Sequence, residues 1–153
     1  MPTFWSNIVY ILKLTGPIVS VLRLVDGEKK PAMGYIYQAM KKAKEAISSS
    51  FNDDENKYKD VFAIIDKRWE CQLHQPLHAA GYYLNPQFYY SDPKIEDDPE
   101  VSSGMLQCVM RLVPNEDDQS RLMEEKQMYK NAEGILGYKL AIRDRNTMSP
   151  GKI

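Results

Sequence analysis

Three residues that could bind a zinc ion lie close together in the sequence: Cys71, His74 and His78. Thiolate and imidazole groups are the usual ligands of zinc, and Cys108 would be available as a fourth. However, Pro76 separates the two histidines, and a proline breaks the helix that would hold them on one face. The chain also lacks the common arrangement of two ligands on each of two separated elements. We therefore expect structural or surface roles for these residues, and no bound metal.

The same residues could supply a Cys–His nucleophilic pair, and adjacent carboxylates occur at Asp53-Asp54 and Asp97-Asp98. Nucleophilic catalysis also needs an orienting group and an oxyanion hole, and no pattern in the sequence supplies them. Neighbouring carboxylates in polar segments are ordinarily solvated. The sequence has no glycine-rich phosphate loop and no dinucleotide-binding fingerprint. These patterns predict a protein with no catalytic residues and no cofactor, and therefore not an enzyme.

Basic and aromatic residues provide a second kind of candidate site. An arginine beside a tryptophan, as in Arg68-Trp69, can stack on a nucleobase while nearby lysines contact phosphates. Trp69 also continues the apolar stripe of its predicted helix, which favours a place in the core. The candidate nucleic-acid-binding residues are Lys29, Lys30, Lys41, Lys42, Lys44, Arg68 and Trp69.

The net charge of the chain is −1, but the charge is unevenly distributed. Residues 1–50 contain seven Lys/Arg against three Asp/Glu, residues 91–125 contain three against ten, and residues 126–153 contain six against two. Such a distribution can steer partners even near zero net charge, although solvated faces are the ordinary explanation. The acidic middle makes nucleic-acid binding the weaker functional hypothesis.

The composition is that of a globular protein, with 43% apolar and 27% charged residues. Two cysteines are too few for a disulfide scaffold. The longest apolar stretch, Ile8 to Leu14, is interrupted by Lys13, whereas a membrane span needs about 20 apolar residues. The N-terminus also lacks the features of a secretory signal. We therefore expect a soluble intracellular chain with no membrane association.

The elements that would position these residues are predicted to be helices. Apolar residues recur at helical spacing over 4–25, where Gly16-Pro17 predicts a kink or a break. Gly27 suits a left-handed helix stop, and Pro31 suits the first turn of the next helix, over 31–48. The short connection favours an antiparallel helical hairpin over 4–48.

A third helix is predicted over 55–73, with capping residues from Asn52-Asp53-Asp54. Its core stripe consists of Tyr58, Phe62, Ile65, Trp69 and Leu73.

Shorter helices are predicted over 77–84, 103–113 and 116–133, the last capped by Asn115. For residues 87–102 we predict an irregular acidic loop on the surface. The tyrosines and the phenylalanine over 82–90 suit either an exposed aromatic surface or a cover over the core. No segment shows sustained strand alternation. The fold class is therefore all-α, an irregular bundle of about five to seven helices in a single domain over 1–145, with a frayed tail at 146–153.

Several segments, in this order, form a pattern that resembles a known family. They are FW at 4–5, GPIVSVLRLVDG at 16–27, KPAMGYIY at 30–37, AKE at 43–45, IDKRW at 65–69, LHQPLHAAGY at 73–82 and LNP at 84–86. The combination closely resembles plant transposase-like proteins of the hAT superfamily, those with a DUF659-type region and a C-terminal dimerisation segment. The resemblance extends from Phe4 to about Arg145.

In that family a zinc-finger DNA-binding region precedes an RNase H-like catalytic core, and a large helical insertion interrupts the core. The resemblance implies that this chain corresponds to the later part of the insertion. The family's first two metal-binding aspartates lie upstream of the matching region and its final glutamate lies downstream, so no catalytic residue is carried over. The zinc finger has no counterpart here, and residues 146–153 depart from the dimerisation segment, which puts that function in doubt.

The resemblance implies a transposon-derived, catalytically inactive helical protein of the nucleus. Such a protein would act through contacts with a second copy of itself or with a related transposase-like protein. The alternative is residual, non-specific binding of nucleic acid by the basic helix over 29–44 and the C-terminal tail.

Overall fold

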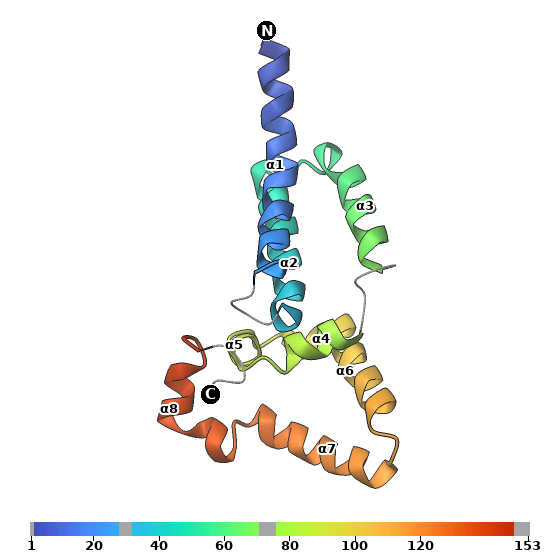
Figure 1. Cartoon of the computed structure of the whole chain (residues 1–153), viewed down its shortest axis with the longest axis vertical. Coiled ribbons are helices and arrows are strands. Elements are labelled where there is room, and N and C mark those ends of the chain that lie inside the picture. The colour runs from blue at the N-terminus through green and yellow to red at the C-terminus, as the bar shows by residue number, and fades with distance from the viewer. Residues whose placement is uncertain (1, 28–31, 71–75, 149–153) are drawn as a thin grey trace. The chain divides into compact units, whose positions relative to one another are not determined.

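The chain is helical throughout the part that the structure, a computed structural model, describes: residues 2–27, 32–70 and 76–148 (Figure 1). These residues form helices and no strand, which confirms the all-α class. Their contacts divide into two compact units, Met1–His78 and Ala79–Ile153. Each unit is described by itself, and the single domain over 1–145 stays a prediction.

The first unit is built on a helical hairpin of α1 (Pro2–Val25) and α2 (Met33–Ser50), drawn in blue and cyan in Figure 1. Leu14 of α1 packs with Ile47 of α2, and farther along α1 Val21 packs with Ala43 and Ile36. Because residues later in α1 meet residues earlier in α2, the two helices are antiparallel. The predicted hairpin is confirmed.

The sequence predicted a kink or a break at Gly16-Pro17, and the break is wrong, because α1 continues through Pro17 as one helix. The kink stays a prediction. Proline removes only one helical donor, and Leu14 and Val21, on either side of it, are both buried against α2. Packing both halves on one partner helix favours a continuous axis over a break. The predicted left-handed stop at Gly27 is also wrong, since only Gly134 among the described glycines has a positive φ. Pro31 lies outside the described residues.

A turn with left-handed backbone at Asn52 and Asp53 (φ 53° and 60°) follows α2. The helix predicted over 55–73 is divided into a 3₁₀ turn, η1 (Glu55–Lys57), and α3 (Lys59–Arg68). No side chain caps either of them, so the predicted caps are wrong. Instead the Ser48 hydroxyl donates to the Asp53 carboxylate at 2.6 Å and is hydrogen-bonded to the Tyr58 hydroxyl at 2.8 Å.

The core stripe of the third helix is confirmed for its described members. Tyr58, Phe62 and Ile65 pack on the cluster that contains Leu14 and Ile47. Trp69 packs on the cluster around Val21 instead. Leu73 lies outside the described residues.

The second unit continues from α4 (Pro76–Tyr83) into α5 (Pro86–Tyr89), η3 (Ile95–Asp97) and α6 (Pro99–Leu112). The irregular surface loop predicted over 87–102 is therefore wrong. Asn85 and Asp98 cap α5 and α6, each accepting a hydrogen bond from the backbone N–H two residues on. Tyr89, Ile95 and Val101 from this stretch are buried. The acidic residues suggested a solvated loop. They lie instead between core positions, because Ile95 and Val101 on either side of them are buried.

The remainder of the second unit comprises α7 (Glu116–Lys130), η4 (Gly134–Gly137) and α8 (Lys139–Asp144). Asn115 caps α7 as predicted, accepting from the Asp117 N–H at 2.8 Å. The helix ends three residues before its predicted end, because Ala132 and Gly134 adopt positive φ. A side chain on Gly137 would lie 2.5 Å from the Ala132 carbonyl oxygen, so only glycine fits there. Of the tail predicted to fray, residues 149–153 lie outside the described residues.

We expect the α1–α2 contact to dominate the stability of the first unit. Ile47 is 0% exposed, so Ile47→Ala should lower the free energy of unfolding by about 2–5 kcal/mol by leaving a cavity. Ile64 on α3 is 63% exposed, and the same substitution there should change it by about 0.5 kcal/mol or less. Urea unfolding followed by circular dichroism measures both. Equal losses in the two variants would contradict this assignment of the core.

Candidate functional surfaces

The residues considered for metal binding and catalysis do not form a site in the described part of the chain. No group of three or more His, Cys, Asp or Glu side chains there could hold a metal ion. Cys71 and His74 lie outside the described residues, and His78 and Cys108 are half-buried. Burial raises the pKa of the Cys108 thiol, and Arg111 only partly opposes this effect.

The adjacent carboxylates have local structural roles. Asp54 pairs with Lys57 at 3.1 Å, and Asp98 caps α6.

The candidate nucleic-acid-binding residues that the structure describes lie on α2, at the end of α3 and directly after it. Lys41 and Lys42 are exposed on α2, as is Arg68 at the end of α3. Lys44 pairs with Asp66 at 2.6 Å and lies over the Phe62 ring. Lys29 and Lys30 lie outside the described residues.

Trp69 is half-buried, and its ring meets the Tyr37 ring edge-on at 6.1 Å. This contact and its packing near Val21 support the core role over base stacking. In the C-terminal tail, Arg143 pairs with Asp144, and Arg145 stacks over the Tyr90 ring.

A buried cluster of tyrosines around Glu96 lies in the second unit. Tyr83 and Tyr89 donate hydrogen bonds to Glu96 Oε1 at 2.7 and 3.0 Å, and Lys130 donates to Oε2 at 2.5 Å. The rings of Tyr89 and Tyr129 pack with centroids 4.8 Å apart. Sequence reasoning left the aromatic residues of this region open between surface and core, and it missed Glu96 altogether. The sequence shows only an acidic residue that follows several tyrosines, and this pattern does not by itself indicate that the carboxylate is bonded to them.

The electrostatics of this cluster follow from burial and hydrogen bonding together. Burial opposes the charge on Glu96, but the hydrogen bonds from Lys130, Tyr83 and Tyr89 outweigh it and lower the pKa of Glu96 to about 2. Burial, reinforced by the bond to Glu96, raises the pKa of Tyr83, so this tyrosine keeps its proton and remains a donor. Both carboxylate oxygens accept hydrogen bonds from the protein, which indicates a structural role for Glu96.

The surface that stands out in the first unit is an apolar stripe of α1 that is mostly exposed. Apolar residues occur on it with alternating spacings of four and three, from Phe4 through Ile8 and Ile11 to Leu22 and Val25. Ile18 continues this spacing but packs against the cluster of Leu14 and Ile47. Thr15 completes this repeat, and its hydroxyl is satisfied by the Ile11 carbonyl at 2.9 Å. Trp5 (63% exposed) and Leu12 (61%) lie beside it. We call this set of residues the α1 seam.

An alternating four–three spacing is the pattern by which one helix packs lengthwise against another. Leu14 and Val21 are buried against α2, and Ile18, between them, packs on the same cluster as Leu14. The apolar surface of α1 is therefore wider than the part that α2 covers, and most of the α1 seam stays exposed.

The length of α1 bears on the expectation of no membrane. Residues Thr3–Val25 are long and apolar enough to cross a bilayer, with a mean hydropathy of 1.8 over 18 residues. This test uses length and composition alone, and helices of soluble proteins and signal sequences also pass it. The argument that Lys13 interrupts the apolar stretch is thus weaker than the sequence suggested, and the absence of membrane association stays a prediction.

Comparison of the chain with protein-family models, with curated proteins and with solved structures finds no match. The resemblance to hAT transposase-like proteins therefore stays an expectation from the sequence.

We expect Glu96 to make the stability of the chain depend on pH. The folded pKa of about 2 lies below the ordinary value of 4.5, so stabilisation by the ionised carboxylate is complete above about pH 4.5 and is lost as the pH falls toward 2. Glu96→Gln should lower the stability by about 1–3 kcal/mol at pH 7. The difference from the unchanged chain should shrink below pH 4.5, as measured by urea unfolding at each pH.

Glu124→Gln is the matched control, because Glu124 is exposed on α7. This variant should follow the unchanged chain at every pH. A Glu96→Gln difference that stays constant down to pH 2 would show that the carboxylate is not held ionised by its partners.

Proposed function

We propose that this chain is a transposon-derived helical protein without catalytic activity that acts through protein–protein contacts, first of all by self-association through the α1 seam. The observation that carries the proposal is the apolar stripe of α1 whose side chains, apart from the packed Ile18 and the half-buried Ile8, are exposed in the first unit. The resemblance of the sequence to the helical insertion of hAT transposases supports it, because such an insertion would pack against other parts of its parent.

The size of the seam suits a second copy of the chain. Its exposed aromatic and aliphatic side chains each offer on the order of 100 Å², and together roughly 700 Å². Stable interfaces bury about 800 Å² on each partner. The four–three repeat also makes the seam self-complementary, since two such helices can interlock their side chains along their length. A related transposase-like protein with the same repeat would bind in the same way.

The chemistry of α2 argues for a protein partner rather than a bilayer. The helix α2 packs along α1 and exposes Lys41, Lys42 and Glu45. A bilayer around α1 would bring these charges into hydrocarbon, where each is costly. Lys13 of α1 is also held by the Ser50 carbonyl at 2.8 Å at the end of α2. A protein partner can cover the seam while α2 stays in water.

A second candidate function is weak, non-specific binding of nucleic acid. The observation that favours it is the pair Lys41 and Lys42, which are exposed and paired with no acidic side chain in the described part of the chain. The engagement of Lys44 with Asp66 limits the available positive charge.

The test of self-association is sedimentation velocity over a range of protein concentrations. We expect a dimer that forms as the concentration rises. Ile11→Glu should weaken it at least about tenfold, because a charge in the middle of the seam would be buried without a partner. The helical signal in circular dichroism should be unchanged, since Ile11 is exposed in the monomer.

Ile64→Glu is the matched control, because Ile64 is a similarly exposed isoleucine on α3. It should leave the dimer intact. A chain that stays monomeric at every concentration would refute the proposal. So would flotation of the unchanged chain with phosphatidylcholine vesicles in the absence of a dimer, which would assign α1 to a membrane.

The nucleic-acid alternative is tested by fluorescence anisotropy with a labelled DNA duplex. If Lys41 and Lys42 contact two phosphates, the logarithm of the affinity should fall with the logarithm of the salt concentration with a slope of about −2. The double variant Lys41→Glu, Lys42→Glu should lose this binding, whereas Lys139→Glu should keep it. An absence of binding at low salt would exclude the alternative.

A further inference from the structure

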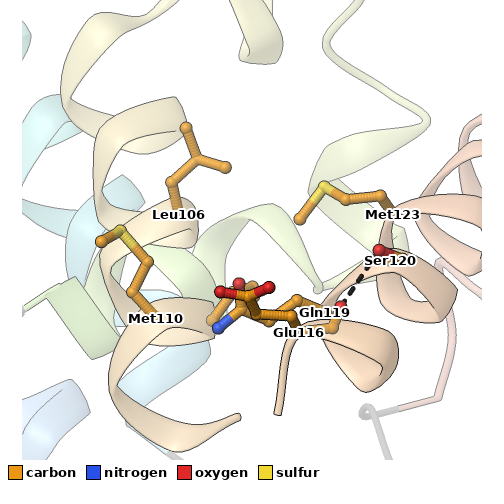
Figure 2. Close-up of a pocket in the computed structure, with 7 residues that line it drawn as sticks. Leu106, Met110, Glu116, Gln119, Ser120 and Met123 are labelled. Carbon is orange, nitrogen blue, oxygen red and sulfur yellow. Dashed lines mark hydrogen bonds between the residues drawn. The ribbon is translucent and has the colours of Figure 1, made fainter. Parts of the chain in front are cut away.

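An apolar cleft lies in the second unit where α6 and α7 diverge from their short connection (Figure 2). Its volume is about 450 Å³. Leu106 projects into it from α6, and Met123 projects from the facing side of α7. Met110 lies at its edge on α6, with a side chain that is 72% exposed and directed away from α7. Val109 is buried at the base.

The polar groups that line the cleft are mostly occupied within the chain. The Gln119 amide donates to the Val113 carbonyl at 2.7 Å and so holds the corner between the two helices. The Ser120 hydroxyl donates to the Glu116 carbonyl at 3.0 Å, the bond drawn in Figure 2. A site for a small polar molecule needs several polar groups that converge on the ligand. Here only the Glu116 carboxylate remains available.

The charge around the cleft is negative. Glu116, Ser120 and Met123 follow at spacings of four and three, so they share one face of α7. Asp117 and Glu124 share the neighbouring face of α7 on the side of Ser120. On the side of Gln119, Lys126 lies over the Tyr83 ring. We call Glu116, which lines the cleft, together with Asp117 and Glu124 the acidic rim. None of these three carboxylates pairs with a basic side chain among the described residues. On α6, Arg111 lies on the face away from the cleft and does not neutralise them.

We propose that this cleft binds a basic amphipathic helix from a partner protein. Such a helix inserts apolar side chains, spaced three and four residues apart, into an apolar groove between two helices. Methionine walls suit this role because the flexible thioether side chain adapts to the shape of its ligand. Lysines or arginines flanking the inserted residues would meet Glu116, Asp117 and Glu124. The binding is separate from self-association, because it uses no residue of the α1 seam.

The test uses two synthetic helical peptides and the full chain. Both peptides carry leucines at positions i, i+4, i+7 and i+11, and their other surface positions are lysine in one peptide and glutamate in the other. We expect the lysine peptide to bind at least about tenfold more tightly than the glutamate peptide in isothermal titration calorimetry. Equal affinity for the two peptides would refute the role of the acidic rim.

Single-residue variants test whether the peptide binds in the cleft. Met123→Gln should weaken the lysine peptide by about tenfold, because it replaces an apolar side chain that faces the cleft with an amide. Glu116→Gln should weaken it about two- to fivefold and reduce its salt dependence. Met128→Gln is the matched control, since Met128 is exposed on α7 but does not line the cleft. A loss of affinity in Met128→Gln as large as that in Met123→Gln would overturn the proposal.

Ile11→Glu separates this proposal from self-association. That variant should bind the lysine peptide as tightly as the unchanged chain. A loss of peptide binding in it would place the peptide on the α1 seam and refute binding in the cleft.

Discussion

The first unit depends on the contact of α1 with α2. Leu14 and Val21 are the buried residues of a 24-residue helix whose remaining apolar side chains are largely exposed. Ala43 is small enough for the two helices to approach closely at Val21, while Ile47 fills the space at Leu14. The α3 segment then packs through Tyr58 and Phe62 on the same cluster. A two-helix hairpin can cover only one stripe of each helix, so the same contact that orders the unit leaves most of the α1 seam uncovered.

The second unit is organised differently, around a charge. Glu96 is half-buried, and its interaction with Tyr83, Tyr89 and Lys130 joins η3 to α4, α5 and α7. Burying a carboxylate is unfavourable unless its oxygens are satisfied, and here both accept hydrogen bonds. Because hydrogen bonds are directional, this arrangement fixes which tyrosine faces which partner more strictly than apolar contact does. The two units therefore use different physical means to hold their helices together.

Periodicity in the sequence was enough to predict the long elements. The stripes of α1, α2 and α3 have strong helical spacing, and Tyr58, Phe62 and Ile65 were predicted as core positions and pack as such. Leu14, which is buried against α2, was not singled out. The Asn115 cap was predicted because its signal is local: one side chain and one backbone donor two residues away. Pro17 was misread because a local rule, the missing donor of proline, competes with packing along the whole length of α2. The interaction of Glu96 with Lys130 spans 34 residues in the sequence and therefore leaves no local trace. The α1 seam could be seen only in part, since spacing shows an apolar face but does not show which face a neighbour covers.

The two proposed surfaces are left exposed for different structural reasons. The α1 seam exists because α1 is apolar on more sides than one neighbouring helix can cover, so its partner needs the same shape and little charge. The cleft exists because the bond from Gln119 to Val113 holds the α6–α7 corner while Leu106 and Met123 still face one another across a gap. A second α1 seam would be a poor occupant of this cleft, because Lys13 and Arg23 are the only basic residues of α1, and Lys13 is already bonded to Ser50. The acidic rim therefore favours a partner other than the chain itself. The same polypeptide can then associate with its copy through one unit and with a basic helix through the other.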